Sequence, residues 1–407
     1  MVSILHISHS DEAGGAAIAA RRMVEAQRAQ GLDARMLVIE RKGQRDFVEQ
    51  AGNPGRVRLA RMAAKRIARL GARKDKDGMR SLGFIASGLG AAIRDRSPDV
   101  VHWHWVGVES VSLAEMASTG IPCAWTCHDQ WAFCGAEHYA PDRRFETGYA
   151  GAGSFDIDAM TFRRKHAAWT GWRPTLIAPS EWMAKEAHSS ALFGDAPIVT
   201  IPNTVSTAIF VPSDKQEARV GLGLPADRKI VLFGADSGTV DPRKGFDLLM
   251  AALKTMPEPS REQIALATFG GSVRASGKMA GFDHIELGRF NSDEDVAQLY
   301  SAADVFVAPS RQDNLPNTMV EAQTCGLRSV AFDIGGMGDI IASPELGELV
   351  QPFDVGAFGA AILSAATTEY DRGAVHRRAA ERFGAETVVR QCTAVYDRLI
   401  AERSAAS

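Results

Sequence analysis

The sequence is poor in cysteine and has no long apolar run. Its 407 residues include 5 cysteines, an odd number that forms no Cys-x-x-Cys motif and no framework of paired disulfides. Scattered cysteines of this kind predict reduced thiols in a cytosolic protein. No stretch has the length of a transmembrane helix, and the chain enters an expected strand at Val2 without a basic and apolar leader. We therefore expect a cytoplasmic location, without secretion or membrane spanning.

The chain also has no strong charge of either sign and no dinucleotide fingerprint. A net charge of -3 predicts no general affinity for nucleic acid. No G-x-G-x-x-G run follows the first expected strand, which disfavours a nicotinamide cofactor. A length of 407 residues exceeds what one hydrophobic core usually organises, so we expect two domains.

Short apolar runs alternate with helical patterns along the whole chain, which is typical of parallel βαβ units. The expected strands lie at residues 2–7, 34–39, 100–105, 123–127, 176–178, 230–234, 264–269, 305–308 and 329–332. This pattern predicts an α/β fold whose second half repeats the organisation of the first.

The segment at residues 306–338 carries the most functional information. Two carboxylates, Asp313 and Glu321, lie eight positions apart, one in a loop after a strand and one about a turn into a helix. Both can face the crevice at the carboxyl edge of a parallel sheet. The helix begins near Asn317, Thr318 and Met319, whose free N–H groups would attract phosphate. A helix first turn for Glu321 and an Asx-turn for Asp313 are the alternative interpretation.

The run Asp-Asn-Leu-Pro-Asn-Thr-x-x-Glu-Ala resembles the Glu-x7-Glu signature of retaining GT-B glycosyltransferases of family 4, in the form of the exopolysaccharide and O-antigen branch. Asp313 stands where the first Glu is usual. The resemblance implies an α/β fold of the GT-B type, with two Rossmann-like domains facing each other across a cleft. It also implies that Glu321 holds the ribose of a nucleoside diphosphate sugar, and that Asp313, Asn314 and Leu315 hold its hexose. No cofactor is expected besides this co-substrate.

The run that begins at Pro202 resembles the family's Pro-Asn-Gly-Val-Asp linker, with Thr204 in place of Gly. Proline stiffens such a crossing and limits helix around it. A terminal helix follows after Glu386, and in GT-B proteins this helix packs back on the first domain. We therefore expect an N-terminal acceptor domain at 1–203, a nucleotide-sugar domain at 204–385, and the returning helix at 386–407.

Two adjacent glycines, Gly14 and Gly15, lie between the first expected strand and an Ala-rich helix at 16–30. Glycines allow a ligand to approach the backbone, and the helix dipole favours an anion. The pair resembles the glycine-rich loop of the first GT-B domain, which borders the donor phosphate and the acceptor. A turn without a ligand is the alternative.

A strand that ends in His128 leads into an aromatic-rich loop. The segment resembles the family's Thr-x-His-Asp-x-Trp-x-Phe-x-Gly-x-x-His-Tyr pattern, in which the first His lies beside the donor hexose. The resemblance assigns that role to His128. It makes Trp131, His138 and Tyr139 candidates for the acceptor side.

His102 and His104 lie two residues apart and therefore share one face of a strand. With His128 they could form the His-x-His site of a metal-dependent hydrolase, which is our alternative from another class of enzyme. The strand is not the first of the fold, which weakens that alternative. The phrase also resembles the family's Asp-x-x-His-x-His-Trp, which places His104 near the acceptor. For His102, a buried imidazole bonded to backbone is the default interpretation.

Arg243 and Lys244 form a cationic pair directly before a helix, where a cation is mildly unfavourable. They resemble the family's Arg-x4-Lys-Gly element, with Lys244 as the phosphate-binding lysine. Ala235 stands where the family's Arg is usual, and Arg243 is the candidate to compensate. The acids at 293–295 follow Ser292 as in a capping box, so we expect no metal there.

The segment from Arg56 to Lys76 carries nine Lys and Arg residues against one acid. Its apolar residues follow helical spacing: Leu59, Met62, Ala63, Ile67 and Leu70. Such a helix can lie on an anionic membrane surface, or it can turn its apolar stripe toward the core. The pattern does not separate the two.

We predict a metal-independent hexosyl glycosyltransferase that acts in cell-surface polysaccharide biosynthesis with retention of configuration. Its donor would be a nucleotide sugar, and its acceptor would be a glycan or a lipid-linked molecule. It would be cytoplasmic and peripheral on the inner face of the membrane. A glycoside phosphorylase or epimerase on the same fold, the metal-dependent hydrolase and an inactive glycan-binding protein stay open as alternatives.

Overall fold

The computed structural model describes residues 2–71, 78–234 and 241–406. Ala235 lies outside the described residues, as do Arg73, Lys74 and Lys76 of the basic segment. The chain forms two compact units. Unit 1 comprises Met1–Pro202 and Val388–Ser407, and unit 2 comprises Asn203–Thr387.

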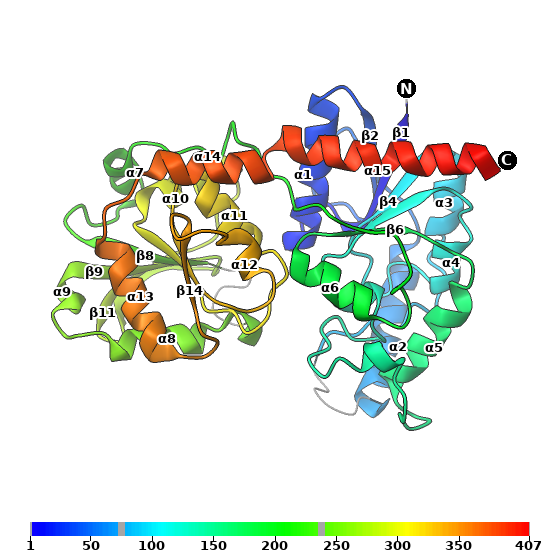
Figure 1. Ribbon diagram of the computed structural model, residues 1–407, viewed down its shortest axis with the longest axis horizontal. Coiled ribbons are helices and arrows are strands. Elements are labelled where there is room, and N and C mark those ends of the chain that lie inside the picture. The colour runs from blue at the N-terminus through cyan, green and yellow to red at the C-terminus, as the bar shows by residue number, and fades with distance from the viewer. Residues whose placement is uncertain (1, 72–77, 235–240, 407) are drawn as a thin grey trace. The chain divides into compact units, whose positions relative to one another are not determined.

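Unit 1 is built on a sheet of seven parallel strands in the order β3-β2-β1-β4-β5-β6-β7 (Figure 1). The strands are β1 (Ser3–Ser10), β2 (Asp33–Glu40), β3 (Val48–Gln50), β4 (Val100–Trp103), β5 (Cys123–Thr126), β6 (Thr175–Ala178) and β7 (Ile198–Thr200). The helices are α1 (Gly15–Ala29), α2 (Pro54–Gly71), α3 (Leu89–Arg96), α4 (Leu113–Ala117), α5 (Ile157–Ala168), α6 (Glu181–Ser189) and most of α15 (Ala385–Ala406), with the short 3-10 helices η1 (Gln130–Ala132) and η2 (Arg144–Thr147).

A different hydrophobic core lies on each face of this sheet. Successive strand residues point to opposite faces, so Ile4 and Val100 pack with Val388 of α15 on one side. On the other side, Trp103 and Trp125 belong to a larger aromatic core. Strands covered on both faces are expected in a parallel sheet.

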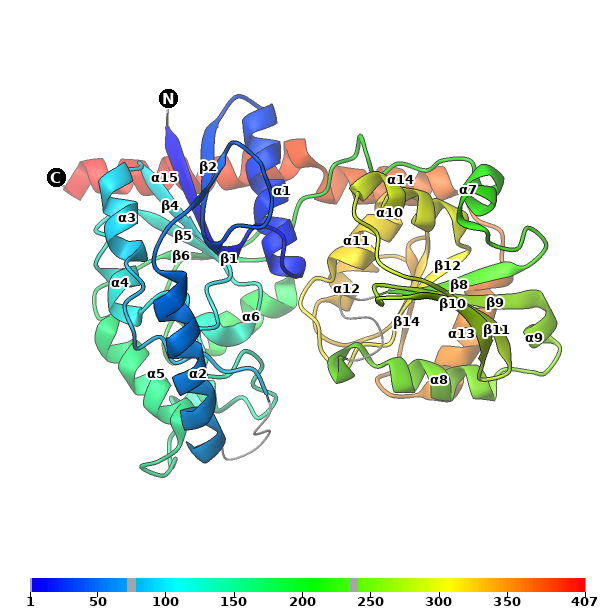
Figure 2. The same ribbon diagram turned by 180° about the vertical axis from the view of Figure 1, so that it is seen from behind.

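Unit 2 repeats the architecture with the strand order β10-β11-β9-β8-β12-β13-β14 (Figure 2). Its strands are β8 (Lys229–Gly234), β9 (Ile264–Phe269), β10 (Arg274–Met279), β11 (Phe282–Leu287), β12 (Val305–Ala308), β13 (Ser329–Phe332) and β14 (Gly347–Val350). Its helices are η3 (Pro242–Lys244), α7 (Lys215–Leu222), α8 (Phe246–Thr255), α9 (Ser260–Gln263), α10 (Asp293–Ala302), α11 (Asn317–Thr324), α12 (Met337–Ile340), α13 (Val355–Thr367) and α14 (Arg372–Phe383).

The prediction of two Rossmann-like α/β domains is confirmed, but the hairpin β10–β11 was not predicted. The strand β10 is an exposed edge strand without apolar alternation, so its sequence does not indicate a strand. The hairpin closes through Ala280 and Gly281, which have φ of 50° and 89°, as a tight primed turn requires.

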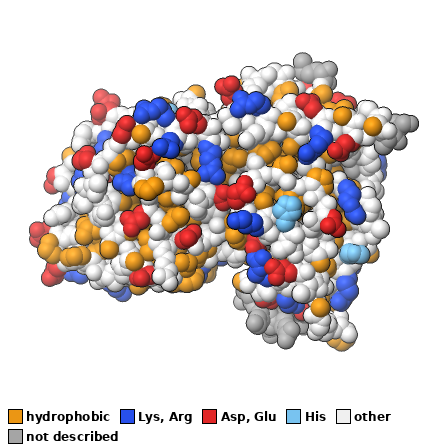
Figure 3. All heavy atoms as spheres, in the orientation of Figure 1, with side chains coloured by type: hydrophobic (Ala, Val, Ile, Leu, Met, Phe, Trp, Pro, Cys, Tyr) orange, Lys and Arg blue, Asp and Glu red, His pale blue; other side chains and the backbone are white. Residues whose placement is uncertain are grey.

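The surface and the thiols agree with the composition. On the face drawn in Figure 3, basic and acidic side chains are interspersed, in keeping with the net charge of -3. All five cysteines are buried and free, as predicted. Among the described helices, none combines the length and the hydropathy that crossing a bilayer requires.

Lys165 of α5 holds the loop that follows β5. Its side chain is fully buried, and Nζ donates to the carbonyl oxygens of Trp131, Cys134 and Gly135. The same atom lies 4.0 Å from the centre of the Trp131 ring. A buried amine requires such complete hydrogen bonding, so this contact fixes the aromatic loop against α5.

We expect Lys165→Met to lower the free energy of unfolding of unit 1 by about 2–4 kcal/mol, because buried carbonyls lose their donor. Urea unfolding followed by tryptophan fluorescence measures this, since all 7 tryptophans belong to unit 1. Arg163→Met, at an exposed position of the same helix, is the control and should change stability by less than about 0.5 kcal/mol. Equal losses in both variants would contradict the assignment.

Candidate active site

In unit 2 the structure joins two of the predicted donor residues. Lys244 ends η3, and Asp313 lies in the loop after β12; Nζ is 2.5 Å from Oδ2. The second carboxylate oxygen of Asp313 accepts the N–H of Asn314 at 3.1 Å. The Lys244 side chain is 24% exposed and that of Asp313 is 11% exposed, so an anionic ligand could reach the lysine.

Glycines hold both loops of this ion pair in place. Gly245 has φ of +70°, and a Cβ there would lie 1.9 Å from the carbonyl oxygen of Pro309. Gly335 has φ of +60°, and a Cβ there would lie 2.0 Å from the carbonyl oxygen of Asp313. Only glycine permits backbone segments to approach so closely in this conformation. The glycine that follows Lys244 therefore positions the lysine against the end of β12.

The start of α11 lies in the same loop cluster. Pro316 precedes Asn317, and no side chain among the described residues caps this helix. Asn317 and Thr318 are partly exposed, as an anion-binding helix start requires. The expectation for Met319 is wrong, because its N–H donates to the carbonyl oxygen of Pro316 at 3.0 Å.

Three of the remaining predicted donor residues are buried, whereas Arg243 is partly exposed. Glu321 is 6% exposed and accepts the hydroxyl of Tyr300 at 2.8 Å. Leu315 packs into the unit 2 core, and Asn314 is buried beside it. Arg243 forms an ion pair with Asp241 at 2.7 Å.

In unit 1 the glycine-rich loop has a defined shape. Gly14 has φ of 85° and directly precedes α1, a conformation that favours glycine. Asp11, which sequence reasoning missed, is fully buried and accepts the N–H groups of Lys42 and Gly43, each at 2.8 Å. This carboxylate ties the loop after β1 to the loop after β2.

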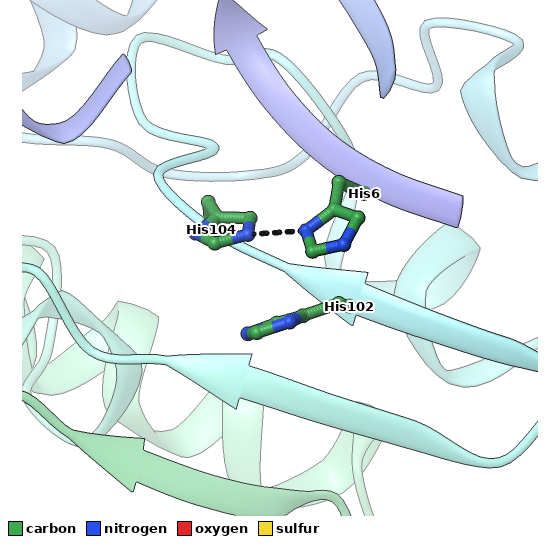
Figure 4. A group of neighbouring side chains, drawn as sticks. All are labelled: His6, His102 and His104. Atoms are coloured by element: carbon green, nitrogen blue, oxygen red, sulfur yellow. Dashed lines mark hydrogen bonds between the residues drawn. The ribbon is translucent and has the colours of Figure 1, made fainter. Parts of the chain in front are cut away.

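Histidines meet in the interior of the same unit (Figure 4). Nδ1 of His6 lies 2.9 Å from Nε2 of His104, and Nδ1 of His104 lies 3.1 Å from Nε2 of His128. His102 was expected to bond to backbone. Its ring nitrogens instead bond to the side chains of Tyr396 and Thr126, each at 2.7 Å. His6 was not predicted because it lies inside the expected first strand at residues 2–7, where no second histidine forms a His-x-His pair with it.

The histidine cluster does not fit a metal ion. Nitrogens of His6, His102 and His104 lie within 4.8 Å of one another. A zinc site needs ring lone pairs that converge on one centre about 2.0–2.1 Å away. Here His6 and His104 share a hydrogen bond. The other ring nitrogens of the three histidines form hydrogen bonds with Gln27, Tyr396, Thr126 and His128. This geometry argues against the metal-dependent hydrolase.

The histidines are also held neutral. Burial lowers the pKa of His6 and of His128 to about 4, from an ordinary value of 6.5. Burial places the pKa of His102 and of His104 well below the ordinary value. At neutral pH each ring therefore has one N–H donor and one acceptor nitrogen.

Trp131 and His138 do not offer polar atoms to an acceptor, which corrects their predicted role. The Trp131 indole N–H donates to the carbonyl oxygen of Ser81 at 2.9 Å. The nitrogens of His138 bond to Asp129 at 2.6 Å and to Ser81 Oγ at 2.8 Å. Their rings stack in the core at 3% and 1% exposure. Tyr139 is partly exposed.

Two family models match the chain in succession. Residues 13–209 match the model described as Glycosyltransferase Family 4, and residues 214–382 match the model described as Glycosyl transferases group 1. The first match lies mostly in unit 1, and the second lies within unit 2. Together the matches assign glycosyltransferase domains to both units.

The chain is similar to curated proteins named D-inositol 3-phosphate glycosyltransferase. The protein of that name from Acidothermus cellulolyticus is 28% identical over 429 residues, which covers 100% of this chain and 90% of the relative. The one from Mycobacterium tuberculosis H37Ra is 32% identical over 247 residues, 56% of this chain and 50% of the relative. These names do not indicate the exopolysaccharide and O-antigen branch that the motifs favoured.

Solved structures share the fold. Sucrose-phosphate synthase from Thermosynechococcus elongatus has a TM-score of 0.68 and 20% identity, with 99% of this chain and 100% of that chain covered. HepE from Anabaena, in complex with UDP and glucose, has a TM-score of 0.68 and 16% identity, with 98% and 100% covered. At these identities the likeness shows the fold alone.

We expect unit 1 to lose stability as the pH falls from 6.5 toward 4. The unfolded histidines bind protons in this window, whereas buried His6 and His128 bind them only near pH 4. The free energy of unfolding should fall by at least about 2 kcal/mol between pH 7 and pH 5. Tryptophan fluorescence in urea measures it.

This titration is best made in the variant Glu137→Gln. Burial raises the pKa of Glu137 to about 7, and this carboxyl therefore opposes the histidines in the same window. Unchanged stability of Glu137→Gln between pH 7 and pH 5 would show that the histidines are not buried as neutral rings.

Proposed function

Because the chain carries the GT-B domains of a family 4-type glycosyltransferase that uses a nucleotide sugar, we propose that it transfers a hexose with retention of configuration to a glycan or lipid-linked acceptor. One observation carries the proposal. Lys244, Asp313 and the uncapped start of α11 lie at the carboxyl ends of the neighbouring parallel strands β8 and β12. Ligands bind α/β sheets at this edge.

The donor would occupy these loops as follows. Lys244 and the N–H groups of Asn317 and Thr318 stabilise the negative charge that grows on the leaving diphosphate. Glu321 holds the ribose, and Asp313 with its neighbours holds the hexose. Arg243 supplies a further cation once it exchanges Asp241 for phosphate.

The ion pair in the structure gives this binding a defined first step. Lys244 contacts Asp313 at 2.5 Å. A diphosphate would replace Asp313 as the partner of the lysine. The carboxylate would then be released to accept a sugar hydroxyl, so one exchange prepares both ends of the donor.

The chemistry requires no protein nucleophile and no metal in this proposal. The acceptor hydroxyl attacks on the face that the diphosphate leaves, and a phosphate oxygen takes its proton. The resemblance to the family assigns His128, Gly14 and Gly15 to the donor and Tyr139 to the acceptor. His104 is buried, with its ring nitrogens bonded to His6 and His128, and it supports His128 from within. Trp131 and His138 instead support the loop from within.

The names of the relatives favour a second acceptor class. A protein 28% identical over 429 residues is named for D-inositol 3-phosphate. A thermal-shift screen of UDP, GDP and their sugars identifies the donor, since a ligand at 100 times its Kd stabilises by about 2.7 kcal/mol. Transfer from that donor to D-inositol 3-phosphate or to a lipid-linked glycan then separates the two acceptors. A role in cell-surface polysaccharide synthesis requires the second result.

The outer face of α2 supports a peripheral membrane site. Val57, Ala60, Ala64 and Ala68 turn toward the core, so small residues form the buried stripe. Larger apolar side chains are exposed, namely Leu59 at 65%, Met62 at 59% and Ile67 at 40%. The described cations of this helix are all exposed: Arg56, Arg58, Arg61, Lys65, Arg66 and Arg69. Apolar side chains among cations suit an anionic lipid surface.

Lys244→Ala should lower turnover at saturating donor by about 10²-fold or more, because the lysine acts on charge that develops in the transition state. Lys254→Ala, at an exposed position of α8, is the control and should retain full activity. Thermal unfolding verifies that each variant is folded. Unchanged turnover in folded Lys244→Ala would remove this lysine from the mechanism.

Replacing Arg58, Lys65, Arg66 and Arg69 with Gln should weaken binding to anionic vesicles by orders of magnitude, at about 1 kcal/mol per cation. Vesicle co-sedimentation at two salt concentrations measures this. The control replaces four exposed cations of unit 2 and has the same net charge: Lys254, Lys278, Arg377 and Arg378. Equal binding by both variants would exclude α2 as the lipid contact.

A further inference from the structure

A chain of hydrogen bonds runs through the interior of unit 1 and ends at His128. Gln27 Nε2 donates to the hydroxyl of Tyr396 at 2.9 Å, and Gln27 Oε1 lies 2.8 Å from Nε2 of His6. His6 continues to His104 at 2.9 Å, and His104 continues to His128 at 3.1 Å. The chain thus joins α15, α1, β1 and the loops after β4 and β5.

The members differ in access to solvent. Gln27 and His6 are fully buried, Tyr396 is 1% exposed and His104 is 3% exposed. His128 is partly exposed. A ligand can therefore meet the chain at its His128 end, while water is kept from the other members.

Neutral imidazoles linked nitrogen to nitrogen have few arrangements. Each ring has one N–H and one lone pair, so a row of rings carries its protons either all on Nε2 or all on Nδ1. The amide at the inner end selects between them. Because Gln27 turns its oxygen to His6, Nε2 of His6 must carry the proton. The same then holds for His104 and His128.

A side branch orients the amide of Gln27. The Tyr396 hydroxyl accepts the Gln27 N–H at 2.9 Å, and its oxygen lies 2.7 Å from Nδ1 of His102. Nε2 of His102 lies 2.7 Å from Thr126 Oγ1. Burial lowers the pKa of His6 and of His128 to about 4, so both rings are neutral at pH 7. The amide oxygen is thus left for His6.

We propose that Gln27, oriented by Tyr396, holds His128 in the Nε2–H tautomer through His6 and His104. In this tautomer Nδ1 of His128 carries the lone pair and is a hydrogen-bond acceptor, which matches a donor group such as a sugar hydroxyl. Gln27, His6 and His104 are positioning residues in this arrangement. The identity of the ligand rests on the proposed function, whereas the tautomer does not.

The test uses the full chain labelled with ¹⁵N-histidine. Two-bond ¹H–¹⁵N correlations at pH 7.5 distinguish Nε2–H from Nδ1–H rings, and single histidine replacements assign the signals. We expect His6, His104 and His128 to share the Nε2–H form. Different tautomers among the three, or a shared Nδ1–H form, would overturn the proposal.

Two variants separate positioning from a general effect on packing. Gln27→Met removes the hydrogen-bond acceptor of His6 and has a similar volume. His128 should then populate both tautomers. We expect kcat/KM for the donor to fall about 2–10-fold, which corresponds to the loss of one hydrogen bond. Thr126→Val cuts only the side branch beyond His102, and the His128 tautomer should persist. A single unchanged tautomer in Gln27→Met, or stoichiometric zinc in the purified wild type, would contradict the chain. The predicted tautomers in a protein without transferase activity would uphold the chain and reject the proposed function.

Discussion

Parallel pairing of neighbouring strands is the constraint that brings the chemistry together in each unit. Because β8 and β12 run side by side in one direction, the loops that follow them end at the same edge of the sheet. Lys244 and Asp313 meet there across 69 positions of sequence. In unit 1 the same geometry sets His6 opposite His102 in register. Antiparallel pairing would send these loops to opposite edges.

The two units use this edge with different electrostatics. Unit 2 places an ion pair and a helix start where solvent still reaches them, so charge is available to an anionic ligand. Unit 1 buries a cluster of imidazoles that stay neutral, because burial makes the charged form too costly. The first arrangement suits binding of a diphosphate. The second sets the orientation of N–H and lone pair at His128.

The aromatic loop after β5 shows how a correct motif can mislead about individual residues. An aromatic-rich loop suggested contacts with an acceptor. The structure instead turns Trp131 and His138 inward, where Lys165 and Asp129 satisfy the loop and its rings. One motif can therefore contain side chains that are buried and only support the loop.

The sequence by itself determined the alternation of strands and helices, and with it the α/β class of both units. It also indicated Asp313, Glu321, Lys244 and His128, because short motifs retain their order along the chain. Only the tertiary structure decided which groups meet. Gln27 and Tyr396 are 369 positions apart, and β10 pairs at an exposed edge without apolar alternation. Periodicity is a local property that sequence records, whereas partners of buried polar groups are chosen by packing between distant segments.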